Sequence, residues 1–266
     1  MASFSTITSI RRDLSTLGIT EGDAVFVHAS MKAIGTTVGG PRVIIEALID
    51  VVGPTGLIAM PGFSGDALFP EDINVDDLTD EARREIEAAV PGFDAAKSPT
   101  FEMGAIAEMF RTWPGTLRSD HPSMSVCLNG FESEEYRAPH SVAWATGEAT
   151  PFGKLYHRPS TKILMIGVGW NRCTALHMAE TFAENRRTKM VRYKEAGYDG
   201  VWKEAIDVAD DLSRLFPSVG RAFEKAGGVV TGSIGQAECR VVDFKECVDF
   251  ASHWINRANL ESGDRH

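Results

Sequence analysis

The chain has 266 residues and a formal net charge of −10 at pH 7, with 43% apolar and 24% charged residues. This composition is typical of a globular protein, and the acidic charge argues against a nucleic-acid binder and suits a cationic small substrate. No run approaches the roughly 20 apolar residues that cross a bilayer, and no basic patch precedes an apolar N-terminal stretch, so we expect a cytoplasmic protein without a membrane partner.

Metal and disulfide chemistry find little support in the sequence. The four cysteines are scattered without a CxxC pair, so we expect reduced, mostly buried thiols. A zinc hydrolase would also use histidine and acidic residues, but there is no HExxH motif. His140, His157 and His177 also lack the usual ligand spacing. We therefore expect no metal.

The first quarter of the chain predicts two helices and two strands. A helix over 5–17 is followed by a strand over 23–30, a glycine-rich turn over 31–41, a helix over 42–52 and a strand over 56–61. A glycine-rich turn before a helix can bind an anion through free backbone N–H groups. Its spacing matches neither GxGxxG nor a P-loop, so a plain tight connection is the alternative.

An acidic segment and a polar loop follow. Residues 66–98 are predicted to form an acidic insertion with a surface helix over 80–89, either as a solvated face or as a mobile lid over a basic substrate. A helix over 103–111 then precedes the loop 118–125, which is dense in hydrogen-bonding side chains and leads into a strand over 126–130. These side chains could hold a polar ligand or cap their own backbone.

The stretch 162–184 organises the second half of the chain. An apolar strand ends in Gly167-Val168-Gly169, and a helix capped by Asn171 or Thr174 is predicted after it. His177, Glu180 and Glu184 then follow i, i+3, i+7 spacing and should share one helix face. Titratable groups just past the end of a buried strand lie where an open α/β sheet places its chemistry. The alternative is a helix with a solvated polar face.

The remaining elements continue the alternation of helices and strands. Strands are predicted over 189–193, 201–204, 229–234 and 239–243, and helices over 212–225 and 245–256. This order favours an α/β sandwich. We expect one domain over 1–266, with the acidic insertion near 66–98.

Several motifs, taken in register, resemble the aminoglycoside 3-N-acetyltransferase family. They are Val27-His28-Ala29-Ser30-Met31 with Gly39-Gly40, Met60-Pro61-Gly62-Phe63, Ser98-Pro99-Thr100 with Met103-Gly104, Arg118 to Ser125, Thr150 to Leu155, and Gly167 to Glu180. The resemblance implies an α/β/α sandwich of the antibiotic N-acetyltransferase type, distinct from GCN5-related acetyltransferases. It implies acetyl-CoA as donor and the 3-amine of an aminoglycoside antibiotic as acceptor, and hence a role in resistance.

The acceptor amine is largely protonated at neutral pH and must lose a proton before it attacks a thioester. A histidine, with an unperturbed pKa near 6.5, suits this role, and His177 is the predicted base. By resemblance, a downstream carboxylate orients its ring, with Asp207 and Glu204 as candidates. Glu180 is either a second orienting group or an acceptor contact. Asp66, Glu184 and Asp207 are predicted to bind other ammonium groups of the substrate.

The resemblance also implies where the donor binds. The Gly35–Gly40 turn and the loop 118–125 should hold pantetheine and phosphates, and either the 30–34 turn or the Ser123 region should stabilise the oxyanion. The residues predicted to bind the donor are Ser30, Met31, Lys32, Ala33, Ile34, Gly39, Gly40, Arg118, Ser119, His121, Ser123 and Ser125. For His28 and His121 a structural role at a strand end is the alternative.

Two other functions stay open. An acetyltransferase of this fold could act on a different amine, because the acidic insertion should border the acceptor site. A relative that has lost activity could persist as a non-catalytic binder of CoA or another small molecule. The sequence gives no oligomeric state.

Overall fold

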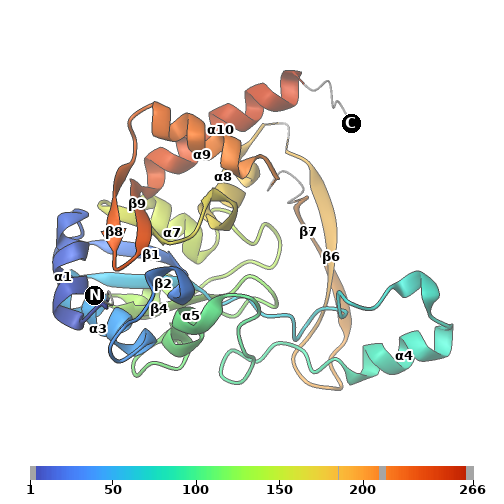
Figure 1. Ribbon diagram of the computed structural model, residues 1–266. Coiled ribbons are helices and arrows are strands. Elements are labelled where there is room, and N and C mark those ends of the chain that lie inside the picture. The colour runs from blue at the N-terminus through green and yellow to red at the C-terminus, as the bar shows by residue number, and fades with distance from the viewer. Residues whose placement is uncertain (1–3, 185, 210–213, 262–266) are drawn as a thin grey trace.

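One mixed sheet forms the centre of the molecule. The computed structural model describes residues 4–184, 186–209 and 214–261, and in this part of the chain seven strands pair in the order β3-β4-β2-β1-β5-β9-β8 (Figure 1). The strands are β1 Ala24–Ala29, β2 Leu57–Pro61, β3 Leu117–Arg118, β4 Val126–Gly130, β5 Thr161–Ile166, β8 Val230–Ile234 and β9 Ala237–Asp243.

The three central strands run parallel. β1 pairs in parallel with β2 on one side and β5 on the other, whereas β4 and β9 join this group antiparallel. Side chains alternate between two cores: Phe26 of β1 belongs to one, and its neighbours Val25 and Val27 belong to the other. Burial on both faces explains why these strands read as continuous apolar runs.

Helices cover both faces of the sheet (Figure 1). One core packs against α7 Pro151–His157, α8 Ala175–Phe182, α9 Phe216–Lys225 and α10 Phe244–Glu261. The opposite core packs against α1 Ile7–Thr16, α3 Pro41–Val52 and α5 Gly104–Arg111. There are also two short helices, α2 Met31–Ile34 and α6 Ser133–Arg137, and two 3-10 turns, η1 Val75–Asp77 and η2 Trp170–Arg172. The predicted α/β/α arrangement is confirmed.

A two-stranded ribbon extends beside the sheet and carries the acidic segment at its side (Figure 1). β6 Thr188–Lys194 pairs antiparallel with β7 Trp202–Val208. The predicted surface helix is α4 Asp80–Ala89, capped by the Thr79 side chain, and it buries none of its residues. Arg192 of the ribbon donates to Glu87 of α4 at 2.5 Å, so the helix is tied to the ribbon.

Two expectations about the stretch after β5 need correction. Asn171 lies in η2, and α8 begins at Ala175 with Thr174 at its N-cap. The helix ends at Phe182, because Ala183 adopts an extended conformation, so Glu184 is outside it and does not share its face with His177. Of the helix predicted over 212–225, residues 212 and 213 lie outside the described residues.

The cysteines and the helix lengths bear on other expectations. Cys127, Cys173, Cys239 and Cys247 are all buried as free thiols, as predicted. No helix in the described ranges combines the length and the apolarity needed to cross a membrane.

Candidate active site

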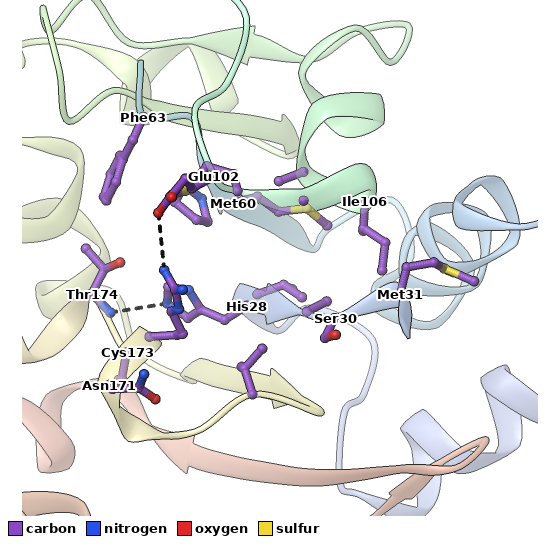
Figure 2. Close-up of a pocket in the computed structure, with 18 of the residues that line it drawn as sticks. His28, Ser30, Met31, Met60, Phe63, Glu102, Ile106, Asn171, Cys173 and Thr174 are labelled. Atoms are coloured by element: carbon purple, nitrogen blue, oxygen red, sulfur yellow. Dashed lines mark hydrogen bonds and ion pairs between the residues drawn. The ribbon is translucent and has the colours of Figure 1, made fainter. Parts of the chain in front are cut away.

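A cavity of about 510 Å³ opens at the carboxyl ends of the central parallel strands (Figure 2). We call it the first cavity. Its walls come from the end of β1 and from α2, from the end of β2, from the start of α5, from η2 and from α8. They include His28, Ser30, Met31, Lys32, Met60, Phe63, Glu102, Met103, Ile106, Arg172, Cys173, Thr174, His177 and Phe216. The location is the one expected for ligand binding in an open α/β sheet.

A second cavity of about 360 Å³ adjoins the first and shares His177 in its wall. It is bordered by the ribbon and by the loops after β2 and before α5. Its walls include Ser64, Leu68, Glu71, Phe101, Ser123, Thr146, Lys189, Val191 and Asp207. Phe63, Glu102, Met103 and His177 line both cavities. The His177 side chain can therefore contact a molecule bound in either cavity.

His177 is held in one orientation by its own helix. Its Nδ1 lies 2.6 Å from Oε2 of Glu180, at i+3 on α8, and its ring meets the edge of Phe216 with centroids 4.9 Å apart. With an ionised Glu180 the Nδ1–H donates, which leaves Nε2 as the nitrogen that can accept a proton. No hydrogen bond to Nε2 is formed within the described residues.

Glu180 is a buried carboxylate with one oxygen committed to the ring. The residue is 3% exposed, and its Oε1 has no hydrogen-bond partner among the described residues. The sequence named Asp207 or Glu204 as the group that orients His177, with Glu180 as a second possibility. In the structure, Glu180 is the carboxylate that contacts the His177 ring.

Asp207 and Glu204 lie three residues apart on β7 and therefore on opposite faces of the ribbon. Asp207 faces the second cavity, and burial raises the pKa of its carboxyl, although an N–H bond from Val208 partly counters this. Glu204 is exposed, pairs in register with Arg192 and lines neither cavity. Glu204 is therefore not placed to orient the His177 ring, contrary to the prediction.

Asp66 and Glu184, the other predicted acceptor contacts, line neither the first nor the second cavity. Asp66 is half-buried in the wall of a third cavity, described below. Glu184 is exposed beyond the end of α8, and its backbone N–H donates to Asn256 of α10 at 2.9 Å.

The loop 118–125 turns most of its polar side chains inward. Arg118 is 7% exposed, donates to the carbonyls of Ser98 and Gly62, and lies over the Phe93 ring. Ser125 donates to the same Gly62 carbonyl at 2.6 Å and accepts from Arg118. These contacts fix the loops after β2 and before α5, so the expected contact of Arg118 and Ser125 with the donor is not supported by their placement.

His121 and Ser119 take part in a second network of internal hydrogen bonds. Nδ1 of His121 accepts the N–H groups of Ser123 and Met124, and its ring lies 4.6 Å from that of His140. Ser119 is fully buried and its hydroxyl lies 2.8 Å from Nδ1 of His140. Burial lowers the pKa of His121 to about 4 and that of His140 to about 3, so both rings are neutral. Of the loop residues predicted to hold the donor, Ser123 lines the second cavity, and the others line neither the first nor the second cavity.

His28 belongs to the first cavity but is not available as a base. Burial lowers its pKa to about 3, and Nε2 accepts from the Thr174 N–H at 3.4 Å (Figure 2). It connects the end of β1 to the start of α8, as the structural alternative expected.

The turn after β1 supplies three of its predicted donor contacts to the cavity. Ser30, Met31 and Lys32 line it, whereas Ala33, Ile34, Gly39 and Gly40 do not. Ile34 is buried, and Ala33 packs against Gly167, where an added Cβ would lie 2.2 Å from the Ala33 Cβ. Gly167, at φ +64°, therefore lets α2 approach the end of β5.

Several residues that line the first cavity were not predicted as site residues. Phe63, Met103, Glu102 and Arg172 all line the first cavity, and Glu102 pairs with Arg172 at 3.9 Å (Figure 2). Phe63 and Met103 belong to motifs that carried the resemblance, so a signal existed. Glu102 has φ +56°, in a region that few non-glycine residues occupy, and nothing in the sequence marks it.

A family model described as aminoglycoside 3-N-acetyltransferase matches residues 26–256, which include both cavities. The chain belongs to this family. An aminoglycoside N(3')-acetyltransferase-like protein, YokD of Bacillus subtilis, is 34% identical over 250 residues, covering 93% of this chain and 91% of the relative. Aminoglycoside N(3)-acetyltransferase III of Pseudomonas aeruginosa is 33% identical over 248 residues, covering 90% and 89%.

Solved structures of aminoglycoside acetyltransferases share the fold. The Bacillus subtilis YokD structure matches with a TM-score of 0.87 at 33% identity, over 95% of this chain and 99% of that one. AAC-IIIb, as a binary complex with CoASH, matches with a TM-score of 0.85 at 31% identity, over 96% and 98%. Sisomicin-bound AAC-VIa matches with a TM-score of 0.83 at 28% identity, over 95% and 98%. Among the described residues, no group of His, Cys, Asp and Glu side chains is arranged to hold a metal ion.

Proposed function

We propose that this protein transfers the acetyl group of acetyl-CoA to the 3-amino group of an aminoglycoside antibiotic. The observation that carries the proposal is the position of His177 in the walls of two adjoining cavities, with its ring held by Glu180. A two-substrate transfer needs one base in reach of both substrates, and family membership identifies the substrates. We also propose that 1–266 is one acetyltransferase domain, acting in the cytoplasm.

The first cavity suits the donor. Met31, Met60, Met103 and Ile106 give it an apolar wall for a pantetheine arm, and Lys32 and Arg172 bring positive charge for phosphates. Acetyl-CoA supplies the activated acyl group as a thioester. The predicted donor contacts at Ser30, Met31 and Lys32 therefore remain part of the proposal.

The second cavity suits a cationic acceptor. Glu71, Glu102 and Asp207 stand in its wall beside Lys189, so carboxylates outnumber cationic side chains among the described lining residues. An ammonium group of the acceptor beside Asp207 would favour the ionised carboxylate and so counter the burial that raises its pKa.

The proton leaves the acceptor amine through His177. The acceptor ammonium first releases one proton to solvent. Nε2 then accepts the second proton as the neutral amine nitrogen attacks the thioester carbonyl carbon, and the Glu180 carboxylate stabilises the imidazolium that forms. Collapse of the tetrahedral intermediate breaks the C–S bond, and the departing sulfur takes the proton back. For the oxyanion we propose the amides of Met31 and Lys32, since a helix start leaves its first N–H groups without intrahelical acceptors.

The proposal is tested by mixing the protein with acetyl-CoA and sisomicin and following free thiol. We expect thiol release that depends on the aminoglycoside, with one acetyl group on the 3-amine by NMR of the product. Release of thiol without an aminoglycoside, or none with several 3-amino aminoglycosides, would refute the enzymatic function. Transfer to a different amine would refute only the position.

A further inference from the structure

A third cavity of about 920 Å³, which we call the annex, adjoins the second cavity. Every residue that lines it belongs to the segment 64–101. Ser64, Leu68, Glu71 and Phe101 line both spaces, so the annex continues the second cavity away from His177. No part of the proposed reaction uses it.

The annex is apolar inside and acidic at its opening. Leu68, Phe69, Ile86, Val90 and Phe101 contribute large apolar side chains to its wall. Of its three acidic members, Glu71 and Asp72 are exposed, as expected at a rim, and Asp66 is half-buried. A hydroxyl-rich sugar ring placed against the apolar side chains would lose hydrogen bonds to water that those side chains cannot replace, whereas a hydrocarbon group would gain by leaving water.

The far wall of the annex is held in place by the ribbon. Lys194 is 2% exposed, and its Nζ donates to the carbonyls of Glu87 and Ala88 at the end of α4, at 3.0 Å each. The Trp202 indole N–H donates to the same Glu87 carbonyl at 3.3 Å. Beyond the helix, the Gly92 N–H donates to the Asp66 carbonyl at 3.0 Å, which closes the segment on itself. The cavity is thus built into the fold.

We propose that the annex receives an apolar substituent carried by the cationic acceptor. The acceptor's ammonium groups lie among the carboxylates of the second cavity, and an alkyl or aryl group on the far side of the molecule passes Glu71 and Phe101 to contact Leu68, Ile86 and Val90. The inference rests on the proposed function, and it enlarges the acceptor class from polar aminoglycosides to amphiphilic ones.

The test compares sisomicin with a sisomicin derivative that carries one O-hexyl chain and the same charge. Burial of each methylene changes affinity by roughly fourfold, so partial insertion should raise kcat/KM at least about tenfold over sisomicin. A89W places an indole in the annex from α4 and should return the ratio of the two kcat/KM values towards one. A88W is the matched control, because Ala88 is the neighbouring exposed alanine and does not line the annex. We expect A88W to leave both kcat/KM values unchanged.

Each outcome decides the question. A ratio near one in the wild-type protein, or the same raised ratio in A89W and A88W, overturns the proposal. A loss of sisomicin turnover in A89W without any hexyl preference also overturns it, and would make the annex a subsite for a polar ring. If neither acceptor is acetylated, the proposed function fails, and calorimetric binding of both amines to the CoA-bound protein still tests the annex. Tighter binding of the hexyl derivative that A89W abolishes supports it, and equal binding overturns it.

Discussion

His177 and the His121–His140 pair are both histidine sites beside hydrogen-bonding side chains, and they differ in what each ring nitrogen contacts. At His177 one nitrogen is held by Glu180 and the other has no partner among the described residues, between two cavities. At His121 and His140 both nitrogens of each ring contact the backbone or Ser119, and burial lowers both pKa values. The chemistry of a histidine here follows from which nitrogen its neighbours leave available.

The largest expected effect comes from removing the His177 ring. His177→Ala should lower kcat by about 10²–10⁴-fold, the usual contribution of a general base, while acetyl-CoA affinity changes little. Steady-state kinetics with sisomicin and calorimetric titration of CoA measure the two quantities. A folded variant that retains near-full kcat would place the base elsewhere and remove the distinction between the two histidine sites.

Glu180→Gln tests whether the carboxylate is what makes His177 different. It should lower kcat by about 10-fold or more, because the imidazolium loses the negative charge that stabilises it. For the same reason, the part of the pH profile over which kcat/KM rises with pH should move to lower pH. Repeating the profile with a second acceptor of different basicity separates this part from the acceptor's own titration. An unchanged profile would show that the 2.6 Å contact does not act on the base.

The His121–His140 pair predicts an effect of pH on the free energy of unfolding. His121 and His140 have folded-state pKa values of about 4 and about 3, against 6.5 unperturbed, so below pH 6.5 the unfolded chain takes up protons that the folded chain refuses. The contribution of these two histidines to the free energy of unfolding is fully present above pH 6.5. It falls as the pH drops towards 4, by up to about 1.4 kcal/mol per pH unit for each histidine.

Urea unfolding between pH 7 and 5 measures this slope. His140→Gln should make it shallower, whereas His253→Gln, at an exposed position, should not. Equal slopes in the two variants would contradict the assignment of His140 as a neutral ring in the folded protein.

The smallest effect concerns the two carboxylates of β7. Asp207→Asn should raise the KM for a cationic acceptor about fivefold, as loss of a partly exposed ion pair does, with little change in kcat. Glu204→Gln, on the opposite face of the ribbon, should change neither constant. The difference should shrink as salt is added. Equal effects of the two substitutions would contradict the orientation of the ribbon.

Local sequence patterns were sufficient for the parallel strands and for the placement of His177 in a cavity wall. β1, β2 and β5 are short apolar runs ended by polar or glycine residues, and both faces of each are buried, so their pattern survives folding. The position of His177 could be predicted because it lies at the start of the helix that follows such a strand.

The orienting carboxylate and the polar loop were harder to predict. The choice between Glu180, Asp207 and Glu204 depended on the end of α8 and on the facing of β7, and both are tertiary features. Arg118 and Ser125 looked like ligand contacts because a side chain that holds a carbonyl has the same donors as one that holds a ligand. Glu102 carried no signal, since its position depends on a backbone conformation that packing imposes.

The most direct measurement of the central claim is a crystal structure of the protein with CoA and an aminoglycoside bound together. The account predicts the sulfur of CoA in the first cavity and the 3-amine in the second, with the amine nitrogen within about 2.6–3.2 Å of Nε2 of His177. A complex in which the 3-amine instead contacts Asp207 or Glu102, with Nε2 of His177 out of hydrogen-bond reach, would contradict it.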